Sequence, residues 1–171
     1  GVVGALVGYL AARLPGAEVE LIDVNPARAA LAEALGCRFA EPEAAEGGAD
    51  VVIHASATAA GLATALALAG AEAVVVEASW YGAGEVAAPL GAAFHSQRLT
   101  LRASQVGAIP PARAPRWSHA RRMAKALDLL TDPVLEALIS GQSDFSELAL
   151  NYSRLLDDPA TLCHVVRYPD P

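Results

Sequence analysis

The chain opens with Gly1-Val2-Val3-Gly4, and a strand-like run, Val19-Glu20-Leu21-Ile22, leads to Asp23. The first four residues match the second half of the pattern G-x-G-x-x-G, and Asp23 follows Gly4 by 19 residues. Glycines in this pattern let the backbone approach a pyrophosphate closely. The unpaired N–H groups in the first turn of the next helix then bind the pyrophosphate. An acid at this spacing hydrogen-bonds the adenosine ribose. We therefore expect Gly1, Val2, Val3, Gly4 and Asp23 to bind a dinucleotide.

The carboxylate of Asp23 also indicates which dinucleotide is bound. It would repel the 2′-phosphate of NADP, so the sequence favours NAD over NADP. Two alternatives remain open at this point. The glycines form an ordinary turn, or Asp23 is only the N-terminal cap of the helix that begins at Pro26.

Helix and strand signals alternate over residues 1–106 with short connections, which is typical of repeated βαβ units. We expect helices over residues 4–14, 26–36, 58–68 and 118–130, and strands over 19–23, 37–39, 51–55, 73–77 and 99–106. The apolar run Val51-Val52-Ile53-His54-Ala55 predicts a strand buried on both faces, whereas the alternation from Leu99 to Val106 predicts a half-exposed strand at an edge of the sheet. The fold class is therefore α/β, with a Rossmann-type doubly wound parallel sheet.

The given sequence contains neither the first strand of such a sheet nor the first glycine of the motif. In the strand order 3-2-1-4-5-6 the first strand lies in the middle, and without it both of its neighbours would have unpaired backbone groups. The chain also lacks an initiator methionine. We therefore expect an upstream portion of the protein. The alternative is a short unrelated domain that opens with glycine.

The sequence changes character beyond the expected sixth strand. Asp132-Pro133 breaks the chain, and a helix over 146–156 and a strand over 162–168 follow. This tail does not continue the βαβ rhythm. We therefore divide the chain into an NAD-binding domain, residues 1–131, which is incomplete at its N-terminus, and a C-terminal segment, residues 132–171, which forms a second packing unit.

The composition limits the functions to consider. The 171 residues carry a net charge of −7, and 54% of them are hydrophobic. This content can fill a core, and the negative charge argues against nucleic acid as a partner. The most apolar stretch, residues 59–76, is interrupted by Gly61 and Glu72, so it predicts a buried helix and strand rather than a membrane span. Cys37 and Cys163 are expected to be small buried side chains without a disulfide. We expect a cytoplasmic protein.

With these elements placed, the chain resembles the C-terminal half of the medium-chain dehydrogenase/reductase superfamily, the zinc alcohol dehydrogenase-like enzymes. The resemblance covers nearly the whole chain and lies in the order of several short motifs. These are Gly1-Val2-Val3-Gly4, Leu21-Ile22-Asp23-Val24-Asn25-Pro26-Ala27-Arg28, Asp50-Val51-Val52-Ile53-His54-Ala55, Trp80-Tyr81-Gly82, and the closing residues 138–140, 145–148 and 165–169.

The resemblance implies an NAD-dependent oxidoreductase that transfers a hydride between a small-molecule alcohol or carbonyl substrate and nicotinamide. By analogy the alcohol is a polyol, a sugar or another secondary alcohol. This chain would supply the cofactor-binding part, and residues 132–171 would return to an upstream catalytic domain. Zinc is expected in the full-length enzyme, with its ligands and the catalytic residues upstream of Gly1. A homodimer is expected through the edge of the sixth strand, residues 99–106.

Further cofactor contacts are expected where the strands end, because open α/β sheets bind ligands at those ends. The residues at the ends of the fourth, fifth and sixth strands are Ala55 with Ser56, Glu77 with Ala78, and Ala103-Ser104-Gln105. The last segment matches the family's contact with the nicotinamide carboxamide, and Arg28 is similar to a basic position over the adenosine. Glu77 departs from the small residue usual in the family, so it either lies beside the nicotinamide or points to solvent. His54 is interpreted as a structural histidine.

Two other functions remain open. An S-adenosylmethionine-dependent methyltransferase also uses a glycine-rich loop and an acid after the second strand, and residues 21–27 would serve there. Methyltransferases of this kind have an antiparallel hairpin at the C-terminal edge of their sheet. The helix and single strand expected after residue 146 do not match such a hairpin well. A non-enzymatic NAD-sensing domain is the other alternative, and a zinc-ligand module upstream would argue against it.

Overall fold

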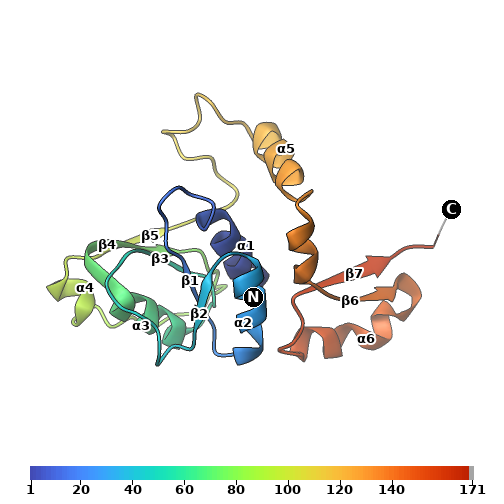
Figure 1. Ribbon diagram of the computed structural model, residues 1–171, viewed down its shortest axis with the longest axis horizontal. Helices are drawn as coiled ribbons and strands as arrows, with labels where there is room; N and C mark the ends of the chain where they lie inside the picture. The colour runs from blue at the N-terminus through green and yellow to red at the C-terminus, as the bar shows by residue number, and fades with distance from the viewer. Residues whose placement is uncertain (170–171) are drawn as a thin grey trace.

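The computed structural model describes residues 1–169, which form three parallel sheets with helices beside them (Figure 1). In chain order the strands are β1 (Glu20–Ile22), β2 (Arg38–Ala40), β3 (Ala49–His54), β4 (Ala69–Glu77), β5 (Thr100–Ala103), β6 (Ile139–Asp144) and β7 (Cys163–Arg167). The sheets have the strand orders β1-β2, β3-β4-β5 and β6-β7. Every strand pair is parallel, so the carboxyl ends of each sheet lie along one edge.

Side-chain caps define where several helices begin. The helical segments are α1 (Val2–Ala11), η1 (Pro26–Arg28), α2 (Ala29–Ala34), α3 (Ala59–Leu68), α4 (Ala93–Ser96), α5 (His119–Leu129), η2 (Pro133–Leu138) and α6 (Phe145–Asp157). Thr58 accepts a hydrogen bond from the backbone N–H of Gly61 and so caps α3. Ser118 caps α5, and Asn25 caps η1, whose first position holds Pro26. The expected helices are therefore present, with ends shifted by a few residues.

The strand order agrees with the expected doubly wound sheet. If β1 to β5 are counted as the second to sixth strands, β2-β1 and β3-β4-β5 are the two flanks of the order 3-2-1-4-5-6. Within residues 1–169, β1 pairs only with β2, and β3 pairs only with β4. Helix α1 packs against both β1 and β3 and so connects the two flanks (Figure 1). The chain has a Rossmann-type α/β fold, as the sequence predicts.

The core consists of two clusters of buried side chains. One lies between α1, α2 and η2, and its members include Ala5, Tyr9, Ala32, Leu35, Leu135 and Leu138. The other lies between α3 and β4, and its members include Leu62, Leu66, Ala73, Val75 and Leu99. The hydroxyl of Tyr9 also donates a hydrogen bond of 2.9 Å to the carboxylate of Asp132. The start of η2 is therefore fastened to α1.

Helix α1 lies unusually close to β1 at one residue, Gly8. A Cβ atom at this position would lie 2.8 Å from Cδ2 of Leu21 and 3.1 Å from Sγ of Cys37. A methyl group at this position would therefore force the side chains of Leu21 and Cys37 to shift within the core. Leu21 precedes Asp23 by two residues, so this contact also positions the acid of the dinucleotide motif.

The expectation that β3 is buried on both faces is wrong. The side chains of Val51 and Ile53 are 54% and 41% exposed. Alternate residues of a strand point to opposite faces, and only the face with Val52 is packed against the cluster between α3 and β4. The face with Val51 and Ile53 has no such cover among residues 1–169. Strand β5 is an edge of its sheet, as expected, but it is shorter than residues 99–106. The expectation that it is half-exposed is wrong, because each of its four residues is exposed.

The C-terminal segment contains a strand that the sequence analysis missed. Strand β6 pairs in parallel with β7, and α6 crosses between them, so this segment is itself a βαβ unit (Figure 1). The expectation that the tail abandons the βαβ rhythm is therefore wrong. The sequence of β6, Ile-Ser-Gly-Gln-Ser-Asp, is mostly polar and carries no strand signal of its own. Cys163 in β7 is exposed rather than buried, whereas Cys37 is buried as expected.

The apolar stretch at residues 59–76 forms α3 and most of β4, as expected for a buried helix and strand. Over residues 1–169, no helix has the length and apolar character that crossing a lipid bilayer requires.

The substitution Gly8→Ala tests the close packing of α1 on β1. Overpacking at this contact should lower the free energy of unfolding of the intact protein by about 1–3 kcal/mol, even though alanine favours a helix by about 1 kcal/mol. Gly91→Ala is the matched control, because a Cβ there meets no atom within 4 Å. Urea denaturation measures both variants. Equal stability of the two would contradict the packing described here.

Candidate functional site

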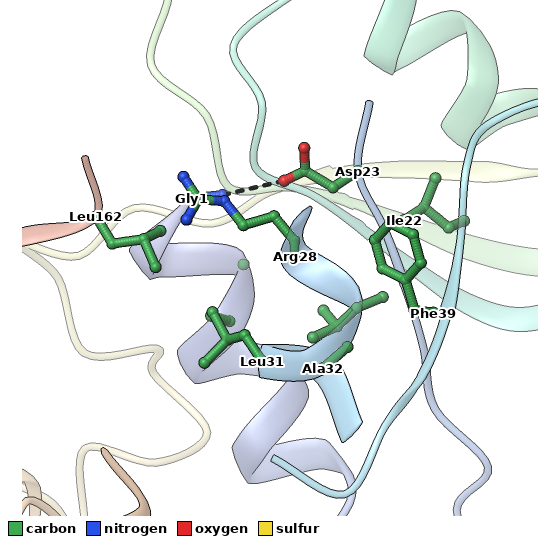
Figure 2. A pocket seen from close by; sticks show the side chains of 11 residues that line it. Gly1, Ile22, Asp23, Arg28, Leu31, Ala32, Phe39 and Leu162 are labelled. Atoms are coloured by element: carbon green, nitrogen blue, oxygen red, sulfur yellow. Dashed lines mark ion pairs between the residues drawn. The ribbon is translucent and has the colours of Figure 1, made fainter. Parts of the chain in front are cut away.

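The residues of the dinucleotide motif surround one hollow at the carboxyl end of β1 (Figure 2). The cavity has a volume of about 50 Å³. Its lining residues include Gly1, Gly4, Ile22, Asp23, Arg28, Leu31, Ala32, Phe39 and Leu162. Asp23 and Arg28 supply charged groups beside Gly1, and Leu31 and Phe39 supply apolar surface. An apolar hollow with few polar groups at its rim is typical of a small-molecule site.

Asp23 does not cap the following helix. Asn25 is the N-cap of η1, and its side-chain oxygen accepts a hydrogen bond of 3.0 Å from the backbone N–H of Ala27. Asp23 Oδ1 accepts a hydrogen bond of 2.9 Å from the backbone N–H of Asn25. Asp23 Oδ2 lies 3.6 Å from the amino group of Gly1, and the side chain is 28% exposed. One carboxylate oxygen is thus held by the loop, and the other faces the glycines.

Arg28 reaches from η1 to the loop before β7. Its Nη2 donates hydrogen bonds of 2.7 Å and 3.2 Å to the carbonyls of Pro159 and Ala160. The same loop places Leu162 in the wall of the hollow (Figure 2). Arg28 therefore lines the hollow and also connects it to the loop before β7. Leu162 was not among the predicted residues, because no local pattern in the sequence links it to β1.

The first turn of α1 is open on the side of the glycines. A Cβ added to Gly4 would meet only Cβ of Ala55, at 4.0 Å. Gly4 therefore lies next to the carboxyl end of β3, where Ala55 begins the following loop. Val3 is 56% exposed on the same first turn, and Val2 is half-buried. The predicted contacts around Gly1 and after β3 are thus brought together.

A second group of polar side chains lies at the carboxyl ends of β3 and β4. We call it the His54 cluster, and its members are His54, Ser56, Glu77, Ser79 and Tyr81. Strand register sets it, because His54 pairs with Glu77 across β3 and β4. His54 Nδ1 lies 2.8 Å from Oε2 of Glu77, and His54 Nε2 lies 2.7 Å from Oγ of Ser56. His54 is buried, with 5% of its surface exposed.

Both oxygens of the Glu77 carboxylate are occupied by donors. The backbone N–H of Ser79 donates to Oε1 at 2.8 Å, and the hydroxyl of Tyr81 donates to Oε2 at 3.0 Å. Burial alone would raise the pKa of Glu77, but the hydrogen bonds from His54, Ser79 and Tyr81 outweigh it and hold that pKa below its ordinary value. Burial and the hydrogen bond to Glu77 raise the pKa of Tyr81. Glu77 is therefore ionised at neutral pH.

These contacts decide where Glu77 points and describe the surroundings of His54. The alternative that Glu77 points to solvent is wrong, since its side chain is only 15% exposed and bonded to His54. His54 is buried and has a hydrogen-bond partner at each ring nitrogen, Glu77 at Nδ1 and Ser56 at Nε2.

The remaining predicted residues line the carboxyl edge of β4 and β5. The backbone N–H of Ala78 donates to the carbonyl of His54 at 2.9 Å, and that of Ser104 donates to the carbonyl of Glu77 at 2.8 Å. Ala103 pairs with Glu77 in the strand register. Gln105 lies two residues beyond Ala103 and is exposed. This edge thus holds the residues after β3, β4 and β5 side by side.

Residues 1–169 contain no group of three or more His, Cys, Asp or Glu side chains arranged to hold a metal ion. These residues therefore do not provide a ligand set for the zinc that the family resemblance implies.

Glu77→Gln tests the electrostatics of the His54 cluster. Because the pKa of Glu77 is lowered on folding, its carboxylate stabilises the fold above the ordinary pKa of 4.5, and this contribution is lost as the pH falls through the lower folded pKa. We expect Glu77→Gln to lower the urea midpoint at about pH 7, and the difference from wild type to shrink below about pH 4.5. Glu85→Gln, in an exposed loop, is the control. A difference that is constant with pH would contradict this account.

No protein-family model and no curated protein matches the chain, but solved structures do. L-idonate 5-dehydrogenase from Escherichia coli is 20% identical, with a TM-score of 0.74 over 98% of this chain and 48% of that chain. The alcohol dehydrogenase TADH from Thermus sp. ATN1 is 22% identical, with a TM-score of 0.71 over 99% of this chain and 49% of that chain. The Bacillus subtilis protein yhfP with NAD bound is 21% identical, with a TM-score of 0.67 over 98% and 51%. The chain thus spans about half the length of the solved structures it matches, and it has the fold of that half.

Proposed function

We propose that this chain is the NAD-binding part of an alcohol dehydrogenase-like oxidoreductase. The observation that carries the proposal is the hollow at β1, where Asp23, Gly1 and Gly4 lie together as the dinucleotide motif requires. Bound NAD would exchange a hydride between C4 of its nicotinamide and an alcohol carbon. The protein's part is to hold the two reacting carbons in a fixed orientation.

Each part of the site has a role in holding NAD. Oδ2 of Asp23 would accept hydrogen bonds from the adenosine ribose hydroxyls, with Arg28 over the same nucleoside. The first turn of α1, whose Gly1 and Gly4 leave space, would receive the pyrophosphate on its N–H groups. From there the dinucleotide would extend past Ala55 and Ser56 to Ala78 and to residues 103–105, where the nicotinamide would lie. Glu77 would contribute a negative charge below this end of the site.

The comparisons support the class of reaction and of substrate. The matched structures include an L-idonate 5-dehydrogenase and an alcohol dehydrogenase, and a third matched protein has NAD bound. For this protein we propose a polyol, a sugar or another secondary alcohol as substrate. Zinc would have to be held by residues outside this chain, so no step of the proposal passes through it.

The C-terminal unit has surface for a further domain. We propose that residues 132–171 pack with a catalytic domain, although residues 170–171 lie outside the described residues. In α6, the side chains of Leu150 and Leu156 are 87% and 68% exposed, and apolar surface of this kind marks interfaces.

The C-terminal unit also bears on the methyltransferase alternative. A methyltransferase expects an antiparallel hairpin there, whereas β6 and β7 are parallel. An NAD-sensing domain would share the hollow and would differ by having no dehydrogenase activity.

Fluorescence titration of the intact protein with NADH, NADPH and S-adenosylmethionine tests the proposal. We expect NADH to bind at least about tenfold more tightly than NADPH, because Asp23 repels the 2′-phosphate. Asp23→Ala should weaken NADH binding about tenfold and reduce the preference for NADH over NADPH. Asp157→Ala, on the exposed end of α6, is the matched control. Binding of S-adenosylmethionine without any response to NADH would overturn the proposal.

We also propose that two copies associate through β5, whose four residues are exposed at the edge of the sheet. Pairing of two β5 strands across a two-fold axis would place each Leu101 near its counterpart. Leu101→Arg would set like charges against each other there and should convert a dimer into a monomer in light scattering. Leu14→Arg, at a side chain that is 62% exposed after α1, is the control. A dimer that persists in the Leu101 variant would contradict pairing through β5.

A further inference from the structure

The His54 cluster contains more chemistry than cofactor binding uses. Its central members have the contacts of a nucleophile, a base and an acid that orients the base: Ser56, His54 and Glu77. We propose that Ser56 is the nucleophile of this triad and accepts an acyl group from an activated ester or thioester. This proposal goes beyond the oxidoreductase function and does not depend on it.

The hydrogen-bond partners assign every proton of the triad. Ionised Glu77 is only an acceptor, so His54 Nδ1 carries the proton of the 2.8 Å contact. His54 Nε2 is then an acceptor, and the Ser56 hydroxyl donates to it over 2.7 Å. This is the tautomer a general base requires, with its lone pair directed at the nucleophile.

Thr58 leaves the proton of Ser56 free for His54. The hydroxyl of Thr58 accepts a hydrogen bond of 3.0 Å from the backbone N–H of Gly61 and lies 3.0 Å from Oγ of Ser56. Its own proton can therefore be donated to Oγ of Ser56. A hydrogen bond to Oγ leaves the Ser56 proton aligned on His54 Nε2.

The triad is rigid where it is buried and open where it would react. His54 is 5% exposed, and Ser79 and Tyr81 hold Glu77 in place. Ser56 is exposed, at the point where the chain leaves β3. The next residue, Ala57, has a φ of 54°, a strained value for alanine, and Oγ of Ser79 accepts its N–H at 3.0 Å. Strain of this kind persists where the surrounding contacts enforce it, often at functional sites.

Gly61 in the first turn of α3 makes room for this arrangement. A Cβ at residue 61 would clash with Oγ of Ser56 and would lie 2.7 Å from His54 Nε2. The same turn carries the N–H groups of Ala59 and Ala60, which precede the first intrahelical donor of this ten-residue helix. Such N–H groups can stabilise negative charge on an acyl oxygen.

The proposed step is a balanced acyl transfer. Oγ of Ser56 forms a bond to the carbonyl carbon of the ester or thioester, and its proton passes to Nε2 of His54. The bond from that carbon to the leaving oxygen or sulfur then breaks, and the leaving group takes the proton from His54. Glu77 stabilises the transient imidazolium. Water releases the acyl group from Ser56 by the same proton path, giving a carboxylic acid and the free serine.

Labelling of the intact protein with a fluorophosphonate probe tests the proposal. The probe should form one covalent adduct per chain, on Ser56, as peptide mass spectrometry would show. Ser56→Ala should abolish the adduct, and His54→Gln should slow labelling by about 100-fold or more, because the general base is lost. Glu77→Gln should slow it by about tenfold or more. Ser96→Ala, an exposed serine on α4, should leave the rate unchanged.

A burst of p-nitrophenolate from p-nitrophenyl acetate gives a second reading. The wild type should release one p-nitrophenolate per chain in the burst, and Ser56→Ala should release none. Ser56 is exposed, so this substitution leaves the core intact. No adduct on Ser56, or a labelling rate equal in wild type and a folded His54→Gln variant, would overturn the proposal. The NADH titration is a separate experiment, so failure here leaves the oxidoreductase proposal untouched.

Discussion

The parallel direction of the strands is the constraint on which the candidate site depends. In a parallel sheet, all strands end at the same edge, and the loops that follow must meet there. In this chain β3 delivers Ala55 and Ser56 to the edge of one sheet, and β4 delivers Glu77 to the same edge, whereas β1 delivers Asp23 to the corresponding edge of the β1-β2 sheet. Helix α1 then brings Gly4 to within van der Waals distance of Ala55. Residues far apart in the sequence are neighbours because the strands within each sheet are parallel and because α1 packs against both β1 and β3.

The His54 cluster shows how the fold accommodates a charge at this edge. Burial of a carboxylate is unfavourable unless its oxygens are hydrogen-bonded. Glu77 meets this condition through hydrogen bonds from a histidine, a backbone N–H and a tyrosine hydroxyl. These bonds outweigh the effect of burial, so the pKa of Glu77 is lowered. The strand register makes the arrangement possible by placing His54 opposite Glu77. Removal of either partner would leave the other as a buried polar group without its main contact.

Local patterns in the sequence predicted the elements that have local causes. The apolar runs and capping residues marked most helices and strands, and the spacing from Gly4 to Asp23 located the hollow. Strand β6 was missed because its residues are polar and only pairing with β7 defines it. The exposure of Val51 and Ile53 depends on which face a helix covers, and the sequence of β3 does not contain that information.

The candidate site was predictable to the same degree. The residues at strand ends followed from the rule for parallel sheets, and Arg28 followed from the family resemblance. Leu162 joins the hollow only through the path of a distant loop. The triad of Ser56, His54 and Glu77 depends on the relative register of two strands. A short-range pattern cannot specify a register, since sliding one strand past the other leaves each sequence unchanged.

A crystal structure of the intact protein with NAD⁺ tests the central claim most directly. The account predicts that the adenosine lies in the hollow of Figure 2, with the Asp23 carboxylate about 2.7–3.2 Å from the ribose hydroxyls. It also predicts the pyrophosphate at the first turn of α1. A nucleotide bound elsewhere, or an Asp23 carboxylate that makes no contact with the ribose, would contradict it.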